Sequence, residues 1–376
     1  MAHQTTEKTN LRIPGPTPVP VEIRQAAARP MMNHRGAEFV AIMNECQEGL
    51  KEILQTKNDT LILTASGTGG LEAAVVNCLS PGDRVLAVSI GYFGQRFANI
   101  ASAYGADVRL LSFPSGCWAE PAAVANALRD DPSIKAVLIT HNETSTGVTN
   151  PLAEIAEVVR NAGTGRHRDT PLLLVDAISS AACIELRTDA WRLDVVVSGS
   201  QKGWMCPPGL AFVALSQRAW QAYQTAAMPR FYFDLGKARK SAEEGATPWT
   251  PAVSVVYALQ HGLRMLCNEG MEQVVARHHR IGQRVRQGVQ ELGLKLVVPD
   301  ERYASDTVTA VRAPADIDPK TLRKRMLDEY DIVLAGAQGD LSGSAFRIGH
   351  LGYVSEEDIN GVLAALRQVL ARTGTA

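Results

Sequence analysis

The sequence predicts an α/β protein with a mostly parallel sheet in a large domain and a smaller C-terminal α+β domain. Between about residues 22 and 260, short apolar runs alternate with helical patterns, as in sheets that helices cover on both faces. After about residue 265 the pattern changes to one long helix followed by shorter, more mixed strands. We therefore expect an N-terminal arm at 1–21, a large domain at 22–264 and a small domain at 265–376.

The individual elements follow from local pattern. The arm contains IPGPTPVP, where proline and glycine preclude a regular helix or a central strand, so we expect an extended segment lying over another part of the fold. The predicted strands of the large domain are TLILT, RVLAVS, ADVRLLSF, KAVLIT, PLLLVDA, DVVVSGS and LAFVAL. Those of the small domain are KLVV, TVTAVRA, IVLAGA and FRIGH, and a last helix follows them.

Composition and charge exclude several classes of partner. The 376 residues carry 38 basic and 39 acidic side chains, a formal net charge of −1, which argues against nucleic acid or an anionic membrane as the main partner. No apolar run is long enough to span a bilayer, and MAHQTTEKTN lacks a signal-peptide pattern, so we expect a cytoplasmic location, with an organelle as the alternative. Six scattered cysteines without a CxxC pair predict reduced thiols, with no metal site and no disulfide framework.

The first candidate site element is a glycine-rich turn. In open α/β sheets, ligands bind outside the carboxyl ends of the strands, so polar residues at those ends are the ones to consider. After TLILT comes ASGTGG, where Ser66, Gly67 and Thr68 open a helix whose free N–H groups and positive dipole end would hold a phosphate. A simple tight turn explains the same residues, because neither GxGxxG nor a Walker A pattern is present.

Two more strand ends carry polar groups. HNETSTG follows KAVLIT and offers amide, carboxyl and hydroxyl groups between Asn142 and Thr146, although a polar loop ending in a glycine turn is the simpler interpretation. Asp176 closes the apolar run PLLLV, where a carboxylate needs a positive partner or hydrogen-bond donors. Capping of a following helix is the alternative for Asp176.

Lys202 follows VVVSGSQ at another strand end. A lysine enclosed by small residues there loses solvation, which lowers its pKa and makes it nucleophilic toward an aldehyde; an ordinary surface lysine is the alternative. A phosphate cradle, a buried carboxylate and an activated lysine together match what pyridoxal 5′-phosphate (PLP) requires. Phe93, in GYFGQRF, either stacks on the cofactor ring or caps the sheet.

These residues resemble the fold-type I, class V aminotransferases, in their alanine/serine–glyoxylate branch. The resemblance runs in order through PGPTP, SGTGG, GYFGQR, HNETSTG, VDAISS, SGSQKG, TPWTPAVS and FRIGHLG, and it covers nearly the whole chain. It implies a fold-type I PLP enzyme that moves the amino group of serine or alanine to glyoxylate, or to a similarly small 2-oxo acid, by a ping-pong mechanism.

The resemblance also implies roles for single residues. Lys202 matches the lysine that links to the cofactor and later moves the α-proton of the amino acid, and Asp176 matches the partner of the ring nitrogen. Arg347 matches the arginine that binds the substrate carboxylate, although in isolation a strand arginine in a surface ion pair is the better interpretation. The other cofactor contacts implied are Ser66, Gly67, Thr68 and Gln201 at the phosphate, Phe93, Thr144 and Ser180 at the ring, and Thr250 from the neighbouring subunit of a homodimer.

Two departures and three alternatives remain open. Phe93 replaces a tryptophan that is frequent in the family, and Trp249 stands where tyrosine is common, so we expect altered affinity or substrate preference with catalysis retained.

The first alternative function, cysteine desulfuration, needs a cysteine near Arg347, and DIVLAGAQGDLSGSAFRIGHLG contains none. A 2-aminoethylphosphonate-type aminotransferase could use His34 and Arg35. A non-catalytic PLP-fold protein should have lost Lys202, Asp176 or Arg347, and all three are present.

Overall fold

The large part of the molecule is built on one seven-stranded sheet. The computed structural model describes residues 6, 9–163 and 170–372. Across the sheet the strands are β2 (Asp59–Thr64), β10 (Leu210–Leu215), β9 (Val195–Gly199), β8 (Leu172–Asp176), β5 (Ala136–Thr140), β3 (Arg84–Ser89) and β4 (Asp107–Ser112). All neighbours run parallel except β10, which is antiparallel to both β2 and β9. The predicted mostly parallel sheet is therefore confirmed.

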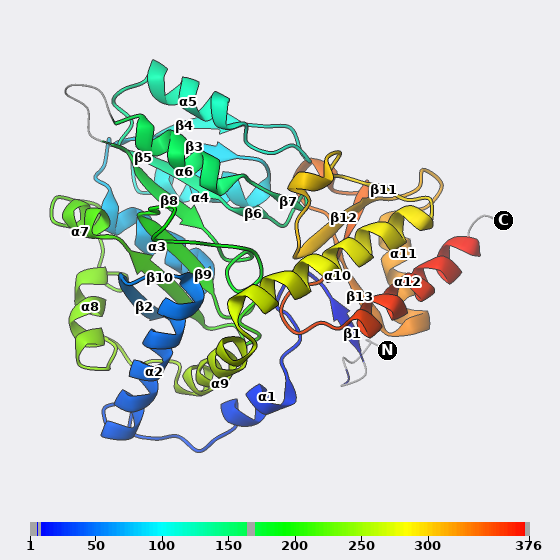
Figure 1. Ribbon diagram of the computed structural model, residues 1–376, viewed down its shortest axis with the longest axis horizontal. Helices are drawn as coiled ribbons and strands as arrows, with labels where there is room; N and C mark the ends of the chain where they lie inside the picture. Colours follow the sequence, from blue (N-terminus) through cyan, green and yellow to red (C-terminus); the bar gives the residue numbers. More distant parts are fainter. Residues whose placement is uncertain (1–5, 7–8, 164–169, 373–376) are drawn as a thin grey trace.

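Helices cover both faces of this sheet (Figure 1). One apolar core includes side chains of α2 (Ala37–Leu54), α5 (Pro121–Asp130), α6 (Leu152–Asn161) and α9 (Val253–Glu269), with α1 (Val21–Ala27) packed beside α9. The core on the other face includes side chains of α3 (Gly67–Cys78), α4 (Tyr92–Ala103), α7 (Gln217–Tyr223) and α8 (Leu235–Glu243). Val196 packs in the first core and Val197 in the second, which explains why the strands are continuous apolar runs and not alternating patterns.

A second, smaller sheet lies beside the first. Its strands, in order, are β1 (Asn10–Arg12), β13 (Ile332–Gly336), β14 (Ala345–Gly349), β12 (Val308–Arg312) and β11 (Lys295–Leu296). Its helices are α10 (Met271–Glu291), α11 (Pro319–Tyr330) and α12 (Glu356–Ala371), and short 3₁₀ turns occupy Glu301–Tyr303 and Gly339–Leu341. A two-stranded hairpin, β6 (Asn142–Glu143) with β7 (Val148–Thr149), forms within the HNETSTG segment and its continuation.

Helix α10 connects the two parts (Figure 1). Val274, near its start, packs in a core of the large sheet, whereas Ile281, two turns later, packs in the core of the small sheet. The predicted division at residue 265 falls inside α9, which packs against α1 and α2. The apolar side chains therefore change from one core to the other along α10, between residues 274 and 281, whereas the predicted division is at residue 265.

The N-terminal arm is extended and joins both parts. Of the predicted arm, 1–5 and 7–8 lie outside the described residues. Asn10–Arg12 pair in parallel with β13 at the edge of the small sheet. Farther along, the Thr17 amide donates to Gln201 O (3.1 Å) and its hydroxyl donates to Lys202 O (3.0 Å). The arm thus crosses from the small sheet to the turn that carries Lys202.

Candidate active site

A cavity of about 310 Å³ opens at the carboxyl ends of the parallel strands. The structure brings together, in its lining, the predicted residues Ser66, Gly67, Thr68, Phe93, Thr144, Asp176, Gln201 and Lys202. Ser180, Thr250 and Arg347 are not in the lining, nor are His34 and Arg35. A larger, open hollow of about 660 Å³, bordered by Glu45 and Arg264, contains none of the predicted site residues.

The turn after β2 has the geometry of an anion cradle. Helix α3 begins at Gly67, and the side chain of its N-cap residue, Ser66, makes no capping hydrogen bond. The first N–H groups of a helix have no partner within the helix, and they carry its positive dipole end. A Cβ on Gly67 would lie 2.6 Å from the Ile178 side chain, so any larger residue here would require Ile178 to move. The predicted cradle therefore has both free donors and a close-packed support.

Asp176 ends β8 as a buried carboxylate. Its Oδ1 accepts from the Ile178 amide (3.0 Å), and its Oδ2 accepts from the Thr140 hydroxyl (3.3 Å). No helix follows it directly, so the helix-capping alternative does not apply. Burial raises its pKa to about 6, which leaves the carboxyl mostly ionised at neutral pH. A buried carboxylate with few donors is suited to receive a positively charged group.

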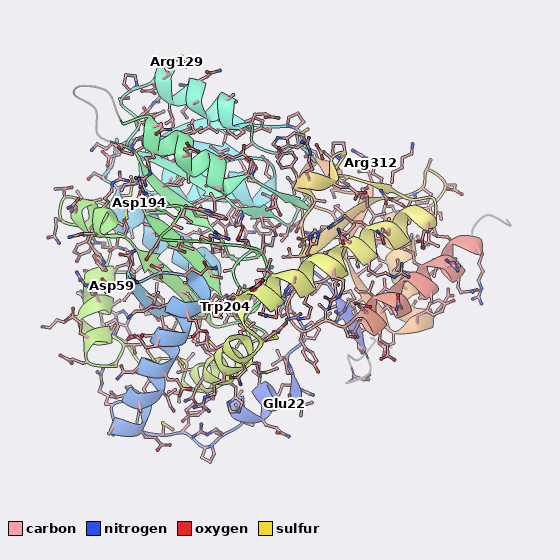
Figure 2. The ribbon with its side chains drawn as sticks, in the orientation of Figure 1. Glu22, Asp59, Arg129, Asp194, Trp204 and Arg312 are labelled. Atoms are coloured by element: carbon pink, nitrogen blue, oxygen red, sulfur yellow. The ribbon has the colours of Figure 1, made fainter. Side chains whose placement is uncertain are left out.

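Lys202 lies in a rigid turn after β9. Trp204 is fully buried below this turn, where its indole N–H donates to Ser198 Oγ (2.8 Å). Figure 2 labels Asp194, which precedes β9, and Trp204, which follows it. Lys202 therefore lies at the same end of the strand as Trp204. The lysine amine donates to the Pro14 carbonyl. Burial lowers the pKa of Lys202 to about 8, although Asp176 acts in the opposite direction, so more of the amine is uncharged near neutral pH.

Gly15 leaves room for the side chain of Lys202. Gly15 has φ +123°, and an added Cβ would lie 2.7 Å from Lys202 Cδ and Nζ. Since a displacement of about 1 Å at a reacting group costs about 100-fold in rate, we expect Gly15→Ala to lower kcat by about that factor. Steady-state kinetics test this, with Gly361→Ala as the control, because Gly361 has open space around it. Unchanged kcat in Gly15→Ala would contradict the inference that the room left by Gly15 positions the Lys202 amine for the reaction.

Helix α4 contributes Phe93 and Arg96 to the lining. The buried Glu143 accepts hydrogen bonds from the backbone amides of Phe93 (3.0 Å) and Gly94 (3.1 Å), and so holds the start of this helix. Burial raises the pKa of Glu143. Arg96 and Glu143 were not predicted as site residues, although the spacing of three residues between Phe93 and Arg96 would have placed both on one face of a helix.

Arg347, on the small sheet, contacts the wall of the cavity from behind, at the backbone of Thr144. It is buried on β14, and its Nη1 donates to Thr144 O (2.9 Å) and Gln338 Oε1 (3.1 Å), while its Nε donates to Gly336 O (2.8 Å). Burial lowers its pKa to about 10. In the described part of the chain it forms no ion pair, so the surface-pair interpretation does not apply. Its Nη2 has no hydrogen-bond partner among the described residues.

Several lining residues had no predicted role. These are Gly15, Pro16, Leu71, Arg96, Asn142, Ile178, Ser179 and Pro208. The Asn142 amide donates to Ser179 Oγ and Thr307 Oγ1, both at 2.8 Å, which connects the cavity wall to the segment before β12. Asn142 lies in the quoted HNETSTG motif, but no local pattern shows that Ser179 and Thr307 meet it.

Cys183, the cysteine beside the turn that carries Lys202, is unsuited to nucleophilic chemistry. Cys183 is buried near Gly203, and burial raises the pKa of its thiol to about 12.

The part of the chain that the structure describes holds no cluster of histidine, cysteine and carboxylate groups suited to a metal ion. Among the same residues, no helix is both long and apolar enough to cross a bilayer.

Comparison with known proteins identifies the family. Residues 22–360 match the model of the family "Aminotransferase class-V". The chain is 44% identical to a Synechococcus protein named soluble hydrogenase, small subunit (98% of this chain, 94% of the relative). It is 37% identical to the L-aspartate–glyoxylate aminotransferase of Paracoccus denitrificans (98% and 93%) and 34% identical to the serine–glyoxylate aminotransferase of Methylorubrum extorquens (98% and 92%).

The fold agrees with these matches. The crystal structure of an alanine–glyoxylate aminotransferase from Nostoc superposes with a TM-score of 0.91 at 32% identity, over 98% of this chain and 97% of that one. This similarity confirms the fold-type I architecture predicted from the sequence. With the family match over most of its length and relatives above 30% identity over nearly all of it, the chain belongs to the class-V aminotransferase family.

Proposed function

We propose that this protein is a PLP-dependent aminotransferase that moves the amino group of a small amino acid, serine or alanine, to glyoxylate or a similarly small 2-oxo acid by a ping-pong mechanism. The observation that carries this proposal is one cavity that combines a helix N-terminus, the buried carboxylate of Asp176 and the amine of Lys202. Family membership supports the reaction type, and the names of the glyoxylate-using relatives support the acceptor.

The residues present fit PLP. Besides the free N–H groups at the start of α3, two buried side-chain oxygens near the cavity, Ser180 Oγ and Gln201 Oε1, have no hydrogen-bond partner among the described residues. Such atoms are costly unless a ligand or water satisfies them. We assign Ser66, Gly67, Thr68 and Gln201 to the phosphate, and Phe93, Thr144 and Ser180 to the ring. When bound, PLP supplies a cationic ring that accepts negative charge from the α-carbon of the amino acid.

Three side chains perform the remaining work. Asp176 holds the proton on the ring nitrogen, because a carboxylate in a buried site favours a cationic partner. Lys202, when free, takes the proton from the α-carbon of the substrate at Nζ and returns it, and its lowered pKa suits this transfer near neutral pH. Arg347 fixes the substrate carboxylate and so orients the α-proton toward Lys202.

The volume of the cavity supports a small substrate. Ligand sites commonly span about 300–1,000 Å³, and this one lies near the lower limit at about 310 Å³. A cofactor in the same space leaves little room for a large side chain. Neither His34 nor Arg35 lines the cavity, so no observation favours the phosphonate-directed alternative.

The proposed assembly is a homodimer with shared sites. Thr250 is exposed and outside the cavity, as a residue that reaches a neighbour's phosphate would be. Beside it, Trp249 stacks on Phe231 (5.0 Å between ring centroids), and Phe231 is 70% exposed. The hydroxyl of exposed Tyr232 donates to Thr64 O, two residues before the cradle. An exposed aromatic surface next to a site is typical of an interface. Light scattering in solution tests the dimer, and a monomeric, active protein would refute it.

We also propose a cytoplasmic location, which is the expectation stated from the sequence above. Fluorescence microscopy of a C-terminally tagged chain tests it.

The test of the function is spectroscopic. We expect the purified protein to show the absorption band of a lysine-bound cofactor. Addition of L-serine or L-alanine should convert the band to that of the aminated cofactor, and glyoxylate should restore it. L-aspartate is included because one relative bears its name. A bound cofactor that ignores all three donors would favour the phosphonate-directed or another class V chemistry, and a protein without any cofactor band would favour the non-catalytic alternative.

A further inference from the structure

Arg96 is a cation in the cavity wall without a countercharge. It lies one turn into α4, and among the described residues it forms no ion pair with a carboxylate. Its guanidinium carbon is 4.9 Å from the ring centroid of Phe93 and 5.1 Å from that of Tyr92. Aromatic faces attract a cation but do not neutralise it. The charge of Arg96 is therefore available to an anion that enters the cavity.

The guanidinium of Arg96 lies at one particular end of the cavity. Its Nη1 lies 3.4 Å from the Thr68 hydroxyl, at the first turn of α3, which is the anion cradle. The stacking on Phe93 and Tyr92 holds the guanidinium over the start of α4 and directs Nη1 toward Thr68. The contact that fixes the direction of this arginine thus belongs to the phosphate end of the cavity.

Charge balance gives a reason for a cation at this end. A phosphate monoester carries about 1.5 to 2 negative charges near pH 7, whereas a helix N-terminus offers only about half a positive charge. Among the described residues of the lining, the only cationic side chain besides Arg96 is Lys202, which must be uncharged to carry out its proposed role. The other described lining groups are the Asp176 carboxylate, which is negatively charged, and hydroxyls, amides and apolar groups. Arg96 supplies the missing full charge.

We propose that Arg96 binds the phosphate group of the cofactor together with Thr68, as the principal positive charge at that group. The assignment depends on the proposed PLP-dependent function. The competing ligand is the distal carboxylate of a dicarboxylate donor such as L-aspartate. The contact with Thr68 favours the phosphate, because it places Nη1 at the cradle.

The experiment compares two ligands that differ only in the phosphate. Full-length protein freed of cofactor is titrated with PLP and, separately, with pyridoxal, which lacks the phosphate, and with inorganic phosphate as a competitor of PLP. We expect Arg96→Gln to weaken PLP binding by about 10- to 100-fold, as for the loss of a charge-assisted hydrogen bond, and to leave pyridoxal binding unchanged. Competition by inorganic phosphate should weaken in parallel, and Arg96→Lys should restore part of both.

A matched control is available on α8. The Arg239 guanidinium also lies over an aromatic ring, 4.7 Å from the Trp220 centroid, but away from the cavity, and it pairs with Asp59 at 3.0 Å. Arg239→Gln should leave all three affinities at wild-type values. Circular dichroism confirms that each variant is folded, and Arg96→Lys carries the comparison if Arg96→Gln is not.

Three results would overturn the assignment. Equal losses for PLP and pyridoxal would show that Arg96 only positions Phe93. Unchanged affinities with a raised KM confined to L-aspartate would assign Arg96 to a substrate carboxylate. Unchanged values throughout would leave it without a ligand role. Failure of the wild-type protein to bind PLP at all would instead refute the proposed function, so the two failures are distinguishable.

Discussion

Replacement of Lys202 by alanine is expected to lower turnover by at least about 10⁴-fold, because the same amine holds the cofactor and moves the α-proton. Among the residues that the structure describes, no other amine lines the cavity, and the neighbouring cation, Arg96, cannot act as a base. The absorption band of the lysine-bound cofactor should be lost as well. Transamination kinetics and an absorption spectrum of the purified variant measure the two effects.

Lys135 provides the control for this variant. It precedes β5 at the opposite edge of the sheet, where its exposed amine pairs with Asp83 at 2.7 Å. Lys135→Ala should keep both turnover and the absorption band. A Lys202→Ala protein with wild-type turnover would remove the lysine from the mechanism.

Arg347→Ala is expected to raise KM for both the amino acid and the 2-oxo acid. Truncating one partner of a buried charge pair costs about 2–5 kcal/mol, and we expect a value in the lower half of that range. The reason is that Nε and Nη1 already donate to Gly336, Thr144 and Gln338. A carboxylate therefore meets chiefly Nη2, and not the two-nitrogen fork that an isolated arginine would present.

KM values for each substrate measure this loss, with Arg312→Ala as the control. Arg312 is on the neighbouring strand β12 of the same sheet but is exposed, and Figure 2 labels it on the small-sheet side of the molecule. The control should keep wild-type KM values. If Arg347→Ala also kept them, another cation, with Arg96 the first to examine, would hold the substrate carboxylate.

The strands of the large sheet were predictable because all of them except the edge strand β4, which is largely exposed, are local apolar runs buried on both faces. All seven predicted runs form strands of one sheet, and the four in the C-terminal part form strands of the other. Which strands lie next to each other in a sheet was not predictable, because strand pairing joins segments that are far apart in the sequence. The antiparallel direction of β10 and the pairing of β1 with β13 are of this kind.

The site residues also divide into those that local sequence predicts and those whose place depends on distant segments. Asp176 and Lys202 could be proposed because each follows a strand whose carboxyl end faces the ligand side of the sheet. Ser180, Thr250 and Arg347 came only from the resemblance, and none of them lines the cavity of this chain. Gly15 and Arg96 went unassigned although both lie within motifs that were recognised. Their roles depend on which way a distant side chain points, and neighbouring residues in the sequence do not determine that.

The N-terminal arm has a consequence for the order of assembly. Asn10 pairs with Ile332, so the small sheet acquires its edge strand from the first residues of the chain and the strand beside it from the last quarter. Contacts between such distant segments form late, because closing a long loop costs entropy before any contact compensates for it. During synthesis the arm leaves the ribosome well before β13, so strand β1 cannot pair until β13 emerges. Since Thr17 of the same arm holds the turn at Lys202, we expect this turn to become fully ordered only after β13 has been made.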